Sequence, residues 1–227
     1  MLTLRYAPQE QFYQGKNYRI PMFNHHPIFE IRFAGSQKDW LKSDYTFQHV
    51  SARIFKQVNV APFGYTNVTV EAGKVFGHVP YPLLQIHRAN QTYSYQLYSY
   101  NLMNFLEFIS DEYVSFDVQH FFNGFFFNKI PLFNRLKWRE VATVKVLYGN
   151  ITDGNDPALN HDLFLLPKDQ IGTQQSFSLE RKPYIEASVG VTNIFKLLRV
   201  DFIKRITYLD HPHVNEFGIR ARAKFDF

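Results

Sequence analysis

The 227-residue chain contains no cysteine, which excludes disulfides, thiolate nucleophiles and cysteine-based metal or iron–sulfur sites. Glycine and proline number only 11 each, which excludes collagen-like and low-complexity chains. No apolar run approaches about 18 residues, so we expect no transmembrane helix. The start, Met1–Arg5, does not have the basic, apolar and small-residue order of a secretory signal, so we expect any export signal outside this sequence.

The charge is not concentrated in any one segment. Basic residues exceed acidic ones by 25 to 20, and the net charge is +5, but no basic run marks a polyanion-binding stretch, so we predict no nucleic-acid partner. Apolar residues make up 45% of the chain, which suits a single folded domain over residues 1–227. The 24 Phe and 14 Tyr coexist with a slightly polar mean hydropathy of −0.28, so the apolar groups must be dispersed among polar ones.

This dispersal has a period of two residues, the spacing at which side chains alternate between the faces of a β-strand. In the segment Phe217–Phe227, every odd position is apolar and every even position is polar or glycine. Eight other segments follow the same alternation, some with exceptions such as Lys204. The nine predicted strands are Leu2–Tyr6, Ile28–Ala34, Tyr45–Val58, Tyr65–Gly73, Tyr113–Phe122, Glu140–Tyr148, Tyr184–Val191, Arg199–Tyr208 and Phe217–Phe227.

The connections between these strands differ in length. Two long loops, at about residues 77–112 and 149–182, fall on the same side of the predicted meander. We expect one or two helical turns in Asn101–Phe108, inside the first of them. A loop as long as residues 77–112 in a compact domain either has a function or counts against the strand assignment, and we expect it to be a folded loop.

One face of the alternation is apolar and the other is charged, and periodicity alone leaves open which face is wet. An outer-membrane β-barrel has apolar residues outside, polar residues inside, short turns at one end and long loops at the other. The alternative is a soluble β-sandwich that buries the apolar face. In the barrel interpretation the residues facing the lumen are Arg53, Glu71, Asp117, Lys145, Glu186, Asp201, Arg205, Arg220 and Arg222.

Nine is an odd number of strands, whereas bacterial single-chain barrels have even numbers. A nine-stranded antiparallel sheet cannot close on itself, and open sheet edges are not tolerated in hydrocarbon. We therefore expect the chain to be part of a larger barrel, completed by a missing N-terminal half or by other chains.

Four segments carry a resemblance to a known family: Val79–Tyr93, Asn101–Asn104, Phe121–Leu136 and Pro183–Lys196. They resemble the C-terminal barrel of outer-membrane proteins that carry a carboxypeptidase-regulatory-like domain. That family is similar to the bacterial surface-antigen barrels of the BamA and TamA class, which act in assembly and translocation.

The resemblance implies a fold and a set of roles. The fold would be all-β, an antiparallel meander forming the last nine of sixteen strands of a transmembrane barrel in the outer membrane of a Gram-negative bacterium. The partners would be outer-membrane lipid, lipopolysaccharide and the barrel assembly machinery, which would read Phe225 and Phe227 as an assembly signal. The loop at 77–112 would insert into the lumen, with Gln85, His87, Arg88, Asn90 and Gln91 as candidates. This loop has no Val-Arg-Gly-Phe or Val-Arg-Gly-Tyr element, in which it departs from the surface-antigen pattern.

Three functions remain open. The first is an integral outer-membrane barrel with a role in protein assembly or translocation. The second is a structural or solute-transport barrel without assembly activity, and the third is a soluble β-sandwich binding module.

The sequence carries few signs of catalytic or metal chemistry. Two closely spaced pairs of histidines occur, His25-His26 and His211-Pro-His213. Both fall in predicted connections, which favours solvated turns over a metal site. The segment Asp153–Asp156 lacks the spacing and distal glutamate of a calcium loop. No nucleophile elbow or glycine-rich phosphate loop occurs. We predict a protein that is not an enzyme and has no catalytic residues, metal or cofactor.

Overall fold

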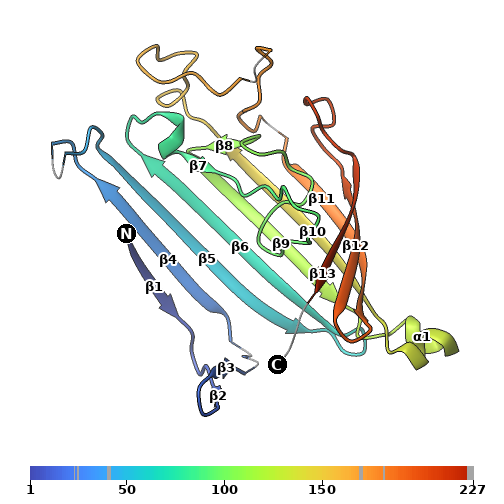
Figure 1. Ribbon diagram of the computed structural model, residues 1–227. Coiled ribbons are helices and arrows are strands. Elements are labelled where there is room, and N and C mark those ends of the chain that lie inside the picture. Colours follow the sequence, from blue (N-terminus) through green and yellow to red (C-terminus); the bar gives the residue numbers. More distant parts are fainter. Residues whose placement is uncertain (23, 25, 40–41, 169–170, 181, 224–227) are drawn as a thin grey trace.

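A computed structural model describes residues 1–22, 24, 26–39, 42–168, 171–180 and 182–223 (Figure 1). Nine strands form one sheet in the order β1-β4-β5-β6-β9-β10-β11-β12-β13, and every neighbouring pair is antiparallel. The all-β antiparallel meander is thus confirmed. The strands are β1 (Leu2–Tyr6), β4 (Ile28–Ser36), β5 (Phe47–Asn59), β6 (Tyr65–Phe76), β9 (Glu112–Phe121), β10 (Arg139–Asn150), β11 (Tyr184–Ile194), β12 (Leu198–Arg205) and β13 (Phe217–Ala223).

All nine predicted strands are present, with differences at their ends. The strand predicted to reach Tyr208 ends at Arg205, and Tyr208 adopts a φ of 55°, which a strand cannot contain. The helical turns predicted in Asn101–Phe108 are wrong, because this segment contains bends, one turn and an isolated bridge at Phe108 but no helix. The proposed assembly signal, Phe225 and Phe227, lies outside the described residues.

Several short elements complete the chain. A small hairpin joins β2 (Phe12–Gln14) to β3 (Arg19–Pro21), and β7 (Gln85–Ile86) pairs with β8 (Ile109–Ser110). Single helical turns occur at η1 (Tyr81–Leu83) and η2 (Phe127–Lys129), and α1 (Pro131–Leu136) follows between β9 and β10. Across the described residues, no helix is both long and apolar enough to cross a membrane.

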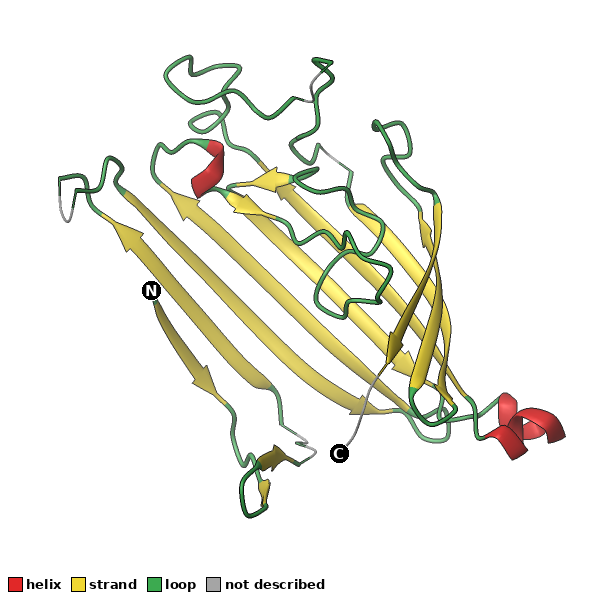
Figure 2. Cartoon of the chain, in the orientation of Figure 1, coloured by secondary structure: helices red, strands yellow, loops and turns green. Residues whose placement is uncertain are grey.

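The two faces of the sheet are different. Residues 87–108, between β7 and β8, lie over one face, and β12 and β13 curl toward that same side (Figure 2). We call residues 87–108 the covering loop, the face beneath it the inner face and the opposite side the outer face. The outer face carries exposed apolar side chains such as Val189 (64% exposed) and Phe202 (57%), whereas Arg205 and Asp201 on the inner face are fully buried. The charged phase of the alternation is therefore the buried one.

Glycine makes two close approaches possible in this sheet. Gly190 lies opposite Asp201 across β11 and β12, and a Cβ at Gly190 would lie 2.6 Å from the Asp201 carboxylate. Gly64, in the β5–β6 turn, has a φ of +99°, and a Cβ there would collide with the Phe121 carbonyl oxygen. The absence of a side chain at Gly190 therefore leaves room for the buried Asp201 carboxylate on the inner face.

The sheet is open, with β1 and β13 as its two edges. The main aromatic cluster packs between the covering loop, the long loop at 149–182 and the inner face. Its buried members are Met103, Phe108, Tyr113, Leu147, Leu179, Tyr184 and Tyr208. This cluster packs the covering loop and the loop at 149–182 against the inner face.

Candidate functional site: the inner face and its covering loop

The charged residues predicted to face one side do so, and four of them form a row. Asp117 on β9 lies opposite Lys145 on β10, Lys145 opposite Glu186 on β11, and Glu186 opposite Arg205 on β12. The signs alternate along the row. The other predicted residues also face charged residues on the neighbouring strand. Arg53 lies directly opposite Glu71, Asp201 opposite Arg220, and Arg222 opposite Arg199.

The row binds the covering loop through the loop's backbone. The Lys145 ammonium donates to the carbonyl oxygens of Gln96 (3.3 Å), Leu97 (2.7 Å) and Ser99 (2.6 Å). The Glu186 carboxylate accepts hydrogen bonds from the backbone N–H groups of Asn101 (2.9 Å) and Leu102 (3.1 Å). Both residues are at most 4% exposed. Charges buried in the sheet are thus satisfied by peptide groups of the loop.

A buried ion pair joins the end of the row to the loop. Arg205 donates to both carboxylate oxygens of Glu107 at 2.5 and 2.9 Å, and the side chains are 0% and 1% exposed. His211 Nδ1 lies 2.8 Å from the same carboxylate. Burial raises the pKa of Glu107, but the hydrogen bonds from His211 and Arg205 outweigh burial, so the pKa lies below its ordinary value. Glu107 is therefore held as a charged acceptor.

The remaining predicted loop residues bind mainly within the loop. Asn90 donates to the Ser94 carbonyl and to the Asn101 side chain, and Gln91 donates to the Met103 carbonyl. Gln85 donates to the neighbouring Ile86 carbonyl. These contacts shape the loop rather than attach it to the sheet.

His87 is buried and lies 3.0 Å from the Ser110 hydroxyl through Nε2. Burial lowers the pKa of His87 to about 3, so the ring is neutral at ordinary pH.

The covering loop also pairs with the edge strand β13. Tyr95 N–H donates to the Ala221 carbonyl (2.9 Å), and Ala221 N–H donates to the Tyr93 carbonyl (3.3 Å). Arg220 donates to the Asn101 carbonyl at 3.3 Å. The loop therefore spans the inner face from β6 to the far edge of the sheet.

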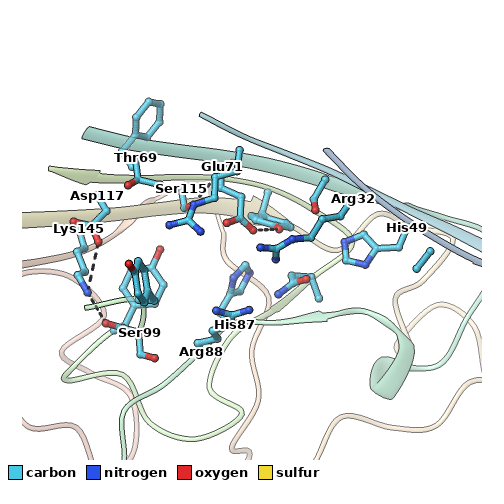
Figure 3. A pocket seen from close by; sticks show the side chains of 18 of the residues that line it. Arg32, His49, Thr69, Glu71, His87, Arg88, Ser99, Ser115, Asp117 and Lys145 are labelled. Atoms are coloured by element: carbon cyan, nitrogen blue, oxygen red, sulfur yellow. Dashed lines mark hydrogen bonds and ion pairs between the residues drawn. The ribbon is translucent and has the colours of Figure 1, made fainter. Parts of the chain in front are cut away.

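A cavity of about 210 Å³ lies between the covering loop and strands β4, β5, β6 and β9 (Figure 3). Arg32, His49 and Glu71 contribute to its sheet side, and His87 and Arg88 to its loop side. At one end Lys145 lies between Asp117, 3.7 Å away, and the Ser99 carbonyl (Figure 3). Charged and hydrogen-bonding groups therefore converge on a partly open space between the sheet and the covering loop.

Sequence reasoning missed two contributors to this face. Glu107 lies in a loop with no periodicity, and nothing local marks it as the partner of Arg205. Arg199 falls in the polar phase of its strand, and this signal could have identified it. Its guanidinium donates to both oxygens of Asp201 at 2.6 and 2.7 Å and lies over the Tyr95 ring.

The histidine and acidic motifs lie elsewhere or serve the fold. His211 stacks on Phe177, with 4.0 Å between ring centroids, in addition to its contact with Glu107. His25 is outside the described residues. Asn155, within the acidic segment 153–156, donates to the Asp111 carboxylate. In the part of the chain that the structure describes, no three His, Asp or Glu side chains are grouped as a metal site.

Comparison with known proteins gives a family but no characterised relative. No curated protein matches the chain. The resemblance to surface-antigen barrels therefore stays a prediction. Residues 1–154 match the family described as "Family of unknown function (DUF5686) C-terminal domain", and this chain, with its large antiparallel β-sheet, belongs to that family.

Proposed function

We propose that this chain forms part of the wall of an integral β-barrel in the outer membrane of a Gram-negative bacterium, with the covering loop inside the lumen. The observation that carries the proposal is the distribution of side chains between the faces. Exposed outer-face residues include Ile31, Ile54, Phe116, Val144, Val189, Phe202 and Ile219, each at least 43% exposed. Water disfavours a contiguous apolar surface of this kind, whereas hydrocarbon accepts it.

The inner face supports the same proposal. The row from Asp117 to Arg205 alternates in sign from strand to strand, and its members are paired with one another or bonded to the loop, as expected for a lumen. A soluble β-sandwich needs a second layer over the outer face, and the exposure of Val189 and Phe202 leaves that face uncovered by the described residues.

The contents of the lumen favour a structural barrel over an open solute channel. Lys145, Glu186 and Arg205 hold the covering loop by hydrogen bonds to its backbone and to Glu107. A charge that is buried and bonded in this way does not line an aqueous path. We therefore expect low conductance from the intact protein.

The two edges of the sheet define what else the barrel needs. Backbone groups along β1 and β13 have to be paired before the sheet can lie in hydrocarbon. The proposal requires further strands, from another part of the protein or from other chains. Outer-membrane lipid and lipopolysaccharide would contact the outer face, and the barrel assembly machinery would insert the protein.

A role in assembly or translocation of outer-membrane proteins is the second candidate function. The observation that favours it is the edge of β13, where the covering loop makes one parallel bridge, between Ser94 and Ala221. A seam held by few hydrogen bonds can open and accept a strand of another protein. The test is site-specific crosslinking from Ile219 to outer-membrane proteins during their assembly, with Ile54 on the wall as the control position.

The first experiment is fractionation of cells that express the full-length protein, followed by electrophoresis in SDS with and without boiling. A folded barrel migrates faster in the unboiled sample and is recovered from outer membranes. Recovery from the soluble fraction without detergent would overturn the proposal. The apolar outer face would then be interpreted as a surface that contacts another protein.

A further inference from the structure

The cavity under the covering loop contains arginine groups to which the described residues provide no ion pair and no side-chain hydrogen bond. Arg53 lies directly opposite Glu71 across β5 and β6 and opposite Glu30 across β4 and β5, but among the described residues it makes no ion pair with either carboxylate. Instead, Glu71 accepts a hydrogen bond from the Tyr113 hydroxyl at 2.8 Å. The Arg53 guanidinium lies 5.3 Å from the centroid of the Tyr98 ring, and its buried Nε has no hydrogen-bond partner in the described structure.

Two further donors line the same space. Arg88, from the covering loop, lines the cavity and is exposed, and the described residues provide no ion pair or side-chain hydrogen bond to it. The buried Nε2 of His49 also lacks a partner in the described part of the chain. Donors from the sheet and from the loop therefore line one cavity, and the described residues give Arg53 Nε and His49 Nε2 no acceptor.

The acidic groups of the cavity are already engaged. Asp117 lies 3.7 Å from Lys145, and Glu71 accepts from Tyr113. Arg32 is bound by Glu30 at 2.5 Å. These pairs leave two cations, Arg53 and Arg88, against one anion, Glu71. The cavity therefore has an excess of positive charge and of hydrogen-bond donors.

We propose that this cavity binds a small oxyanion, with Arg53 and Arg88 as its principal ligands and His49 as a further donor. Planar guanidinium groups match the paired oxygens of a carboxylate or phosphate, and such charge-assisted hydrogen bonds are short and strong. About 210 Å³ is room for a phosphate group or a small carboxylate with its attached atoms. The site depends on the inner face and the covering loop and does not require the membrane location proposed above.

The test is isothermal titration of the full-length folded protein, purified without phosphate, with inorganic phosphate and with a short-chain phosphatidic acid. The variants are Arg53→Gln and Arg88→Gln. The matched control is Arg135→Gln, which removes the same charge from the exposed helix α1. Unboiled electrophoresis, or gel filtration if the protein is soluble, shows independently that each variant is folded.

We expect one phosphate per chain, an affinity at least about tenfold weaker in Arg53→Gln, and no change in Arg135→Gln. Phosphatidic acid that binds while phosphate does not, with the same dependence on Arg53, would support the site and assign its ligand to a lipid headgroup. Absence of binding by both probes, or binding that Arg53→Gln leaves unchanged, would overturn the proposal. A soluble protein that binds phosphate would overturn the membrane proposal and leave this one intact.

Discussion

The buried pair of Glu107 and Arg205 gives the most quantitative prediction. Replacing Glu107 by leucine keeps most of the side-chain volume but removes the acceptor of four hydrogen-bonded groups: two nitrogens of Arg205, the ring of His211 and the backbone of Asn104. Summing about 1.5–3 kcal/mol for each charged hydrogen bond would overstate the loss, because the bonds share one carboxylate. Removing one partner of a buried ion pair costs about 3–5 kcal/mol, and we expect this range.

The assay is urea unfolding of the refolded protein, followed by tyrosine and tryptophan fluorescence. With a slope of about 3 kcal/mol per molar urea, the midpoint should fall by about 1 M or more. The double variant with Arg205→Met removes the unpaired charge and should recover part of this loss. Glu112→Gln breaks the exposed pair with Lys74 and should leave the midpoint nearly unchanged. If Glu107→Leu behaves like Glu112→Gln, the reasoning about this buried pair is wrong.

Three further predictions address the outer face, the acid response and the loop. Val189→Lys on the outer face should lower the free energy of unfolding by about 2–4 kcal/mol in a membrane or detergent. The control Leu165→Lys, in the long loop at 149–182, should have little effect. Equal effects of the two substitutions in urea titrations would contradict a lipid-facing outer face. His87 has a folded pKa of about 3 against 6.5, so its stabilising contribution is complete above pH 6.5 and is lost as pH falls toward 3; His87→Gln should flatten this part of the stability–pH profile. Lys145→Met releases three loop carbonyls and should speed chymotrypsin cleavage within Gln96–Ser99 in limited proteolysis, and an unchanged rate would show that other contacts hold the loop.

The sheet could be predicted because its alternation is a local property of the sequence. Each residue of the pattern faces one side or the other, so segments such as Phe217–Ala223 identify themselves without knowledge of their neighbours. The ends of the strands could be predicted less well, because an alternating pattern can continue beyond the last paired residue. Ile206 and Tyr208 continue the alternation of β12, but the positive φ of Tyr208 belongs to a turn that receives the Arg205 side chain at the Tyr208 carbonyl.

The site was only half predictable. The strand residues Lys145, Glu186 and Arg205 were identified from their polar phase, whereas their partners lie in a loop with no period. Arg205 and Glu107 are 98 residues apart in sequence, and no spacing rule connects them. Helix α1 was not predicted, although Pro131 at its first turn is a recognised start signal, because the residues between β9 and β10 were treated only as a connection.

The bridge between the covering loop and β13 has a consequence for the order of folding. Residues 93–95 are synthesised long before Ala221, and Lys145, Glu186 and Arg205 also follow the loop in sequence. Strands β4, β5 and β6 pair through contacts that are local in sequence, whereas the loop's hydrogen bonds to Lys145, Glu186 and Ala221 require β10, β11 and β13. We therefore expect closure of the covering loop over the inner face to follow the pairing of these later strands.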